Sequence, residues 1–247
     1  MIRKNKNSYY LAIITLIVAL SASSCNDYFI DPVIRGCGNL TTETREISDI
    51  NSVNLRVPAE VIIRQAEKAS LLIEADRNLM PILADDVAGK TLYLQSRKNI
   101  RLSKNKITVY IDIPDLENLK ILGSGNIYVE DVFQTDRISL TIQGSGNISI
   151  GLDTELLEST IKGSGDLHLD GFSEKHMVEV MGSGNIYASN LENDICKISV
   201  MGSGNSHVKV YNSLEVSIKG SGNVYYSGSP NVYSIVNGTG KIIKASK

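Results

Sequence analysis

With 247 residues, 42% of them hydrophobic, the chain is long enough for one large all-β domain or two small ones. Its 25 basic and 27 acidic residues are scattered, and this pattern excludes the basic patch of a nucleic-acid-binding protein. A disulfide framework is excluded as well, because only Cys37 and Cys196 follow Cys25 and they lie far apart in the sequence.

The first 24 residues have the three parts of a secretory signal. Arg3, Lys4 and Lys6 precede an apolar run, Leu11–Leu20, that is too short to cross a bilayer, and small residues come after it. We therefore predict that residues 1–24 are a signal peptide and that the protein is exported.

Cys25 follows the small residues directly, and this arrangement resembles the lipobox of bacterial lipoproteins. The resemblance implies cleavage before Cys25, acylation of its thiol and new amine, and contact with a membrane through the lipid. Residues 25–35 would then be a lipid-anchored tether, with the outer membrane as the expected location and either leaflet open. The alternative is ordinary secretion with an unmodified Cys25.

Residues 36–115 are predicted to form a β-rich N-terminal cap. Short runs of β-branched and aromatic residues, such as Val61–Ile63 and Ile107–Ile111, alternate with turn residues. A short helix is expected within residues 78–86. A solenoid needs an atypical end to shield its first edge, so we expect the cap to be continuous with the repeats after it.

Residues 116–247 are organised by the repeated motif Gly-Ser-Gly-Asn. The copies recur every 18 to 21 residues, and they begin at Gly123, Gly144, Gly163, Gly182, Gly202 and Gly220, with a degenerate copy at Gly238. A fixed period of this length is typical of a solenoid, in which each coil buries its apolar face against its neighbours.

The residues before each motif alternate between apolar and polar, as in a strand with one buried face. The residue two positions before each opening glycine is always β-branched: Ile121, Ile142, Ile161, Val180, Val200, Ile218 and Val236. Parallel crossovers are nearly always right-handed. The sequence therefore predicts an all-β fold, a right-handed parallel β-helix. A left-handed helix of hexapeptides is rejected, because the motif occurs once per period and not three times.

The motif itself is assigned to structure. Two glycines imply a corner with positive φ or close approach to the next coil, and asparagine can bond neighbouring backbone groups. We predict a ladder along one edge made of Asn126, Asn147, Asp166, Asn185, Asn205 and Asn223. A calcium roll is rejected because the period is too long and only Asp166 is acidic.

Together with the Gly36–Ile47 and Ile73–Met80 segments, these repeats resemble the "putative auto-transporter adhesin" head domain family of Bacteroidetes lipoproteins, a domain of unknown function. The resemblance covers roughly residues 36–247 and implies a β-helical cell-envelope protein. The chain departs from the repeat between Leu55 and Val61, where Arg56-Val57-Pro58-Ala59-Glu60 stands in place of a motif copy.

One outward column is the candidate ligand-binding face. The second residue after each motif asparagine is predicted to point outward, and the column contains Tyr128, His168, Tyr187, His207 and Tyr225, with Ser149 among them. Stacked coils lie ~4.8 Å apart, so the rings would form a ribbon suited to a glycan or an extended peptide. The alternative is that the rings only pack on one another.

The remaining polar residues give little catalytic material. His176 falls near an inward column and is expected to mark a bulge, whereas Cys196 falls in an inward column as a small buried hydrophobe. We expect no catalytic residue, no cofactor and no metal ion. The predicted function is a non-enzymatic, adhesin-like binding or display module. The alternatives are a carbohydrate-active enzyme on a β-helix, which would need clustered acids, and a purely structural envelope component.

Overall fold

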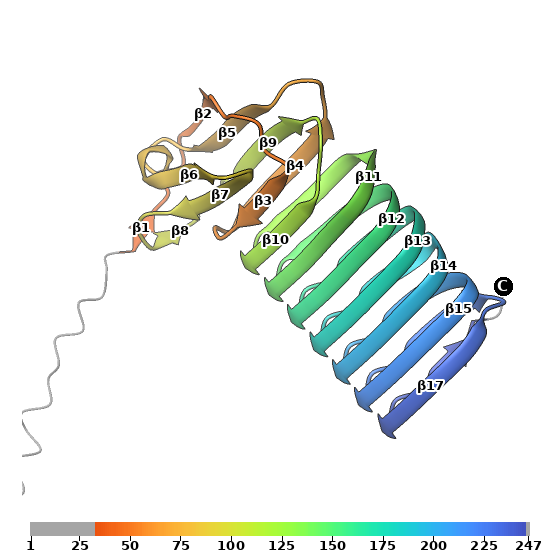
Figure 1. Ribbon diagram of the computed structural model, residues 1–247. Helices are drawn as coiled ribbons and strands as arrows, with labels where there is room; N and C mark the ends of the chain where they lie inside the picture. The colour runs from red at the N-terminus through yellow and green to blue at the C-terminus, as the bar shows by residue number, and fades with distance from the viewer. Residues whose placement is uncertain (1–32, 246–247) are drawn as a thin grey trace, which may run out of the picture. The chain divides into compact units, whose positions relative to one another are not determined.

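The computed structural model describes residues 33–245 (Figure 1). The predicted signal peptide, Cys25 and most of the predicted tether lie outside the described residues. The strands before the repeats are β1 Ile34–Arg35, β2 Leu40–Arg45, β3 Ser52–Leu55, β4 Ala59–Gln65, β5 Ser70–Asp76, β6 Leu83–Ala88, β7 Thr91–Ser96, β8 Ile100–Arg101 and β9 Ile107–Ile113. The strands of the repeats are β10 Asn118–Gly123, β11 Asn126–Gly144, β12 Asn147–Gly163, β13 Leu167–Gly182, β14 Ile186–Gly202, β15 Ser206–Gly220, β16 Val224–Gly228, β17 Asn231–Gly238 and β18 Ile242–Lys244.

The repeats form a parallel β-helix, which confirms the fold class predicted from the sequence. Each of β11 to β15 follows most of one coil, and successive coils pair in parallel, as the stacked arrows in Figure 1 show. The opening glycines of the motif are in register through the whole stack, from Gly123 to Gly238. We call the segments that precede the motif the long face and the segments that directly follow it the ring face.

The core of the stack consists of continuous aliphatic columns. The β-branched residues two positions before each opening glycine are completely buried from Ile121 to Ile218, but Val236 in the last coil is 41% exposed. A column of this kind leaves no room between rungs, because each side chain rests on its equivalents above and below. Burial therefore depends on having a coil on both sides.

The corner of each coil requires glycine for two separate reasons. The first glycine has positive φ, for example +135° at Gly144, a region that L side chains rarely adopt. The second lies so close to the preceding coil that a Cβ at Gly165 would sit 1.9 Å from the carbonyl oxygen of Gly146. The Gly-Ser-Gly spacing is thus fixed by backbone stacking.

The first corner of the helix is made without the motif. Strands β3 and β4 pair with β10 and β11, so that Leu55 aligns with Ile121 and Glu60 with Asn126. The Arg56–Ala59 segment thus occupies the corner position, with the same number of residues. The strands beneath it, β7 and β9, are joined by a longer segment, residues 97–106, that contains the short strand β8. No tight corner lies directly below Arg56–Ala59, so the glycines are dispensable here.

The cap ends the helix with antiparallel strands. Strand β6 runs antiparallel to β7 on the long face. On the ring face β5 runs antiparallel to β9, and β2 in turn runs antiparallel to β5. The side chain of Arg45 on β2 bonds Asp85 on β6 and the carbonyl oxygens of Leu83 and Met80, which ties the two edges together. The helix expected within residues 78–86 is a single 3-10 turn, Met80–Ile82. Within residues 33–245, no helix is long and apolar enough to span a membrane.

Candidate functional site

The predicted outward column is present on the ring face, and four of its rings stack on one another. The ring centroids are 4.8 Å apart for His168 and Tyr187, 5.6 Å for Tyr187 and His207, and 4.6 Å for His207 and Tyr225, with interplanar angles of 17°, 19° and 9°. The ring spacing matches the separation of neighbouring strands. The register of the coils therefore sets the stacking.

Stacking decides which parts of these rings a ligand could reach. The faces of Tyr187 and His207 are covered by the rings before and after them, so their edges are the accessible parts. Partial burial lowers the pKa of His207, which keeps its imidazole neutral at neutral pH. The packing alternative thus explains the inner rings.

The column is interrupted at Ser149. By register this residue lies between Tyr128 and His168, so these two rings are two coils apart, roughly 10 Å. Tyr128 is 42% exposed, and within residues 33–245 no ring stacks on it. The row of rings is therefore interrupted for one rung between Tyr128 and His168.

The motif asparagines and Asp166 lie in one column beside the rings and are joined by hydrogen bonds. Asn147 donates its backbone N–H and its side-chain amide to Oδ1 of Asn126, both at 3.0 Å, and Asn185 bonds Oδ1 of Asp166 in the same way. The pattern continues through Asn205 to Asn223. Because each side chain satisfies the next coil's backbone, this column holds the corners together.

A second polar column lies inside the helix, and it was not predicted from the sequence. Thr135, Thr154, Ser173 and Asn193 occupy equivalent positions at a second corner, and the last three are buried. Their side chains donate to backbone carbonyls two residues ahead or behind, as Ser173 Oγ does to Lys175 at 3.0 Å. This column could have been identified from the sequence, because small polar residues recur at these positions with the period of the motif.

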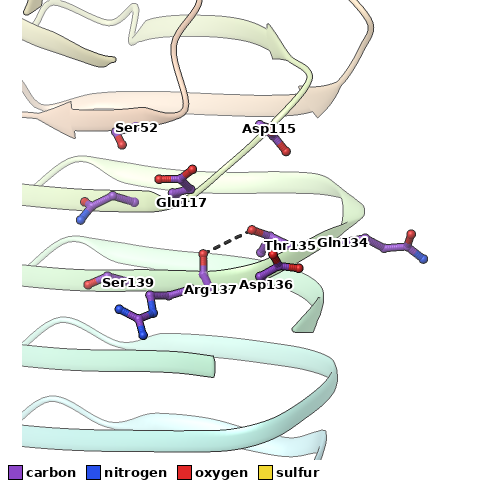
Figure 2. Close-up of a pocket in the computed structure, with 9 residues that line it drawn as sticks. Ser52, Asp115, Glu117, Gln134, Thr135, Asp136, Arg137 and Ser139 are labelled. Atoms are coloured by element: carbon purple, nitrogen blue, oxygen red, sulfur yellow. Dashed lines mark hydrogen bonds between the residues drawn. The ribbon is translucent and has the colours of Figure 1, made fainter. Parts of the chain in front are cut away.

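An acidic hollow lies where the cap meets the first repeats, and Figure 2 shows its lining side chains. Its volume is about 550 Å³, and its lining includes Asp115, Glu117, Asp136 and Arg137. Asp115 and Glu117 are exposed, and the hydrogen bond drawn in Figure 2 joins Thr135 Oγ1 to the carbonyl oxygen of Arg137 at 3.2 Å. Glu117 and Asp136 lie far apart in the sequence and come from different coils, and the stacking of those coils places both in the lining of one hollow.

Two further polar residues are interior. Cys196 is buried in the expected column, and burial raises the pKa of its thiol far above the usual value. His176 lies in that same column, in register with Leu157 and Cys196, so the expected bulge is wrong. Its Nε2 lies 2.9 Å from Ser159 Oγ, and burial lowers the pKa of the imidazole to about 3. In the described part of the chain, no cluster of three or more His, Cys, Asp or Glu residues could hold a metal ion.

Solved structures of Bacteroidetes proteins share this architecture. A "putative adhesin" from Bacteroides fragilis is 25% identical, with a TM-score of 0.80 over 85% of this chain and 98% of that chain. A "putative lipid binding protein" from Parabacteroides distasonis is 23% identical, with a TM-score of 0.75 over 87% and 100% of the two chains. A "putative adhesin" from Parabacteroides merdae is 24% identical, with a TM-score of 0.69 over 87% and 100%. These likenesses support the fold.

No curated protein matches the chain. A family model, however, matches residues 49–230, which include most of the cap and every copy of the motif except the degenerate one at Gly238. The match agrees with the resemblance that the repeats suggested. The chain belongs to the family described as "Putative auto-transporter adhesin, head GIN domain".

Proposed function

We propose that the protein is a non-enzymatic, adhesin-like binding module of the bacterial cell envelope, and that the ring column is its recognition surface. The observation that carries the proposal is the stack of His168, Tyr187, His207 and Tyr225 together with its interruption at Ser149. Family membership supports the adhesin-like class and leaves the ligand open.

The interruption favours a glycan ligand over an extended peptide. A pyranose ring entering at Ser149 would lie about 4.8 Å from Tyr128 on one side and from His168 on the other, and it would continue the existing spacing. The stacked rings beyond it would offer a line of hydroxyl and imidazole edges for hydrogen bonds with further sugars. The hydrophobic faces of a pyranose gain most when both are covered, because apolar area leaves water on each side.

The test is a glycan array probed with the full chain, followed by titration of the tightest glycan. Replacing Tyr187→Ala together with His207→Ala should weaken binding about tenfold or more, since it removes two edge hydrogen bonds that contribute about 1 kcal/mol each. Ser149→Tyr should weaken it as well by filling the interrupted rung. The control is Tyr211→Ala, a tyrosine that is 41% exposed and lies outside the column. Unchanged affinity in the column variants would refute the proposal, and an array without any binder would favour a protein ligand or a purely structural role.

The acidic hollow supports a second candidate, a carbohydrate-active enzyme. Paired carboxylates are the usual machinery of glycoside hydrolysis, and Glu117 and Asp136 line one cavity. Against this candidate, both acids are exposed to water, whereas a general acid needs surroundings that favour its protonated form. Release of reducing ends from uronate-containing or neutral glycans, abolished by Glu117→Gln, would establish it.

We also propose that Cys25 anchors the protein to the outer membrane through lipid, as its position after the predicted signal peptide suggests. Labelled fatty acid should be incorporated into the unchanged protein and not into the Cys25→Ser variant. A Cys25→Ser variant that still carries the label and fractionates with membranes would contradict this proposal.

A further inference from the structure

The open end of the β-helix presents a strand unlike the other edges of the sheet. Strand β17 pairs with β15 on one side only, and all eight of its residues are exposed. Val232 and Val236 continue buried core columns, yet they are 38% and 41% exposed, while their equivalents Leu214 and Ile218 are fully buried. In the part of the chain that the structure describes, the core therefore ends uncovered on this face.

Edges of this kind are normally protected by charge, because unpaired backbone groups invite another strand. Three other terminal strands of the main sheet follow this rule: β6 contains Asp85 and Asp86, β2 contains Glu43 and Arg45, and β18 contains Lys244. Strand β17 has the sequence Asn-Val-Tyr-Ser-Ile-Val-Asn-Gly and no charged residue. The long-face segment of β15, to which it pairs, carries Glu215 and Lys219.

The sequence of β17 is chemically symmetric about Ser234. In an antiparallel pairing of two copies centred on this residue, Val232 of each copy would face Val236 of the other, and Asn231 would face Asn237. Tyr233 would face Ile235 on the outer surface. The inward side chains of both copies would then stay on the same side of the joined sheet, so the two cores would become continuous.

The directions of the backbone N–H and C=O groups of β17 are consistent with a pairing centred on Ser234. On the long face the N–H of Ser139 points to the preceding coil, where it donates to the carbonyl oxygen of Glu117 at 2.9 Å. The register carries Ser139 to Tyr233 in the last coil. Since N–H groups alternate sides along a strand, Tyr233 and Ile235 bond β15, and the N–H and C=O of Ser234 point to the open edge. Ser234 can thus exchange both bonds with its own symmetry mate.

We infer that β17 is a homodimerisation edge, at which two copies of this chain join through antiparallel β17 strands across a twofold axis at Ser234. The contact is isologous, so it closes at two copies and does not propagate into a fibre. Because the cap covers the opposite end of each helix with charged antiparallel strands, the tail-to-tail arrangement uses the uncharged edge of each copy.

Analytical ultracentrifugation of the full chain between about 1 and 100 μM tests the inference, with a concentration-dependent dimer as the expected result. Ile235→Lys places a charge at the centre of the joint, and Ser234→Pro removes the N–H that points to the open edge and that β15 does not use. Each should raise the dissociation constant of the dimer at least about tenfold. The control is Ser217→Lys, one rung inward in the same outward column as Ile235, which should dimerise like the unchanged chain.

The register is tested by cysteine cross-linking in a background with Cys25→Ser and Cys37→Ser. In the proposed pairing residue 234 faces itself with a Cα separation of ~5.5 Å, which a disulfide can bridge. Ser234→Cys should thus form a covalent dimer on oxidation, and Asn231→Cys, which faces position 237, should not. A chain that stays monomeric at 100 μM, or a dimer that survives both Ile235→Lys and Ser234→Pro, would overturn the inference.

Discussion

The requirement for glycine at the corners can be measured by comparing one substitution at two equivalent positions. Gly123 and Gly144 both open a motif, with φ of +129° and +135°. A Cβ at Gly123 would meet nothing within 4 Å, whereas a Cβ at Gly144 would lie 2.2 Å from the carbonyl oxygen of Gly123. Gly123→Ala therefore introduces backbone strain alone, and Gly144→Ala introduces the same strain together with a clash between coils.

The difference between the two variants can be estimated from the contacts. Strain at an unfavourable φ costs about 1–3 kcal/mol and is common to both. To relieve the clash, the corner at Gly144 must move away from the coil below by about 1 Å. That movement breaks the bonds from Ser145 N–H and Gly146 N–H to the oxygen of Gly123, now 2.9 and 3.1 Å long. At about 1 kcal/mol for each bond, Gly144→Ala should be about 2 kcal/mol less stable than Gly123→Ala.

Guanidinium unfolding followed by far-ultraviolet circular dichroism measures this difference, since the chain has no tryptophan to report by fluorescence. The slopes of the two transitions should agree, and the midpoint of Gly144→Ala should be the lower. Equal midpoints would show that backbone strain alone selects glycine and that the close approach of the coils adds nothing.

Three further predictions concern the polar residues of the stack. Asn185→Ala removes the amide bond to Asp166 and two bonds accepted from Asn205, and it should cost about 2–3 kcal/mol in urea unfolding; a loss below 1 kcal/mol would argue against the ladder as a stabilising element. Because burial lowers the pKa of His176 from its ordinary value of 6.5 to about 3, the unfolded chain binds the extra proton between these values, and the free energy of unfolding should fall by about 1.4 kcal/mol per pH unit as pH drops below 6.5. His176→Leu with Ser159→Ala should lose that part of the slope, and an unaltered pH profile would contradict the assignment. A thiol reagent should modify Cys37 rapidly, since hydrogen bonds from the backbone of Asn39 and Asn78 lower the pKa of this exposed thiol, whereas Cys196 should react only on unfolding; equal rates in the folded protein would be inconsistent with its burial.

Most of the repeat region was predictable because each coil imposes the same constraints on the same positions. The inward column from Ile121 to Ile218 and the corner glycines from Gly123 onward could be identified from spacing alone, since parallel stacking in register repeats each requirement at a fixed period. The inner polar column of Thr154, Ser173 and Asn193 obeys the same rule. His176 was misjudged because a histidine in an apolar column becomes acceptable only through its partner Ser159, one coil away.

The candidate sites depended more on tertiary structure. The sequence placed Tyr187 and His207 in one outward column, but only the side-chain packing decided that their faces cover one another. The acidic hollow joins residues of different coils, and the cap is built from antiparallel pairings that occur once and have no period to reveal them.

The sequence by itself thus determined a stacked β-helix with glycine corners, an aliphatic interior and an outward row of rings, because those features follow from a pattern repeated at every rung. Tertiary structure alone decided how antiparallel strands close the first edge, which rings of the outward row cover one another, and how the core columns come to lie exposed along β17. At such places the contacts join residues whose separation along the chain follows no rule, so only the packed coordinates bring them together.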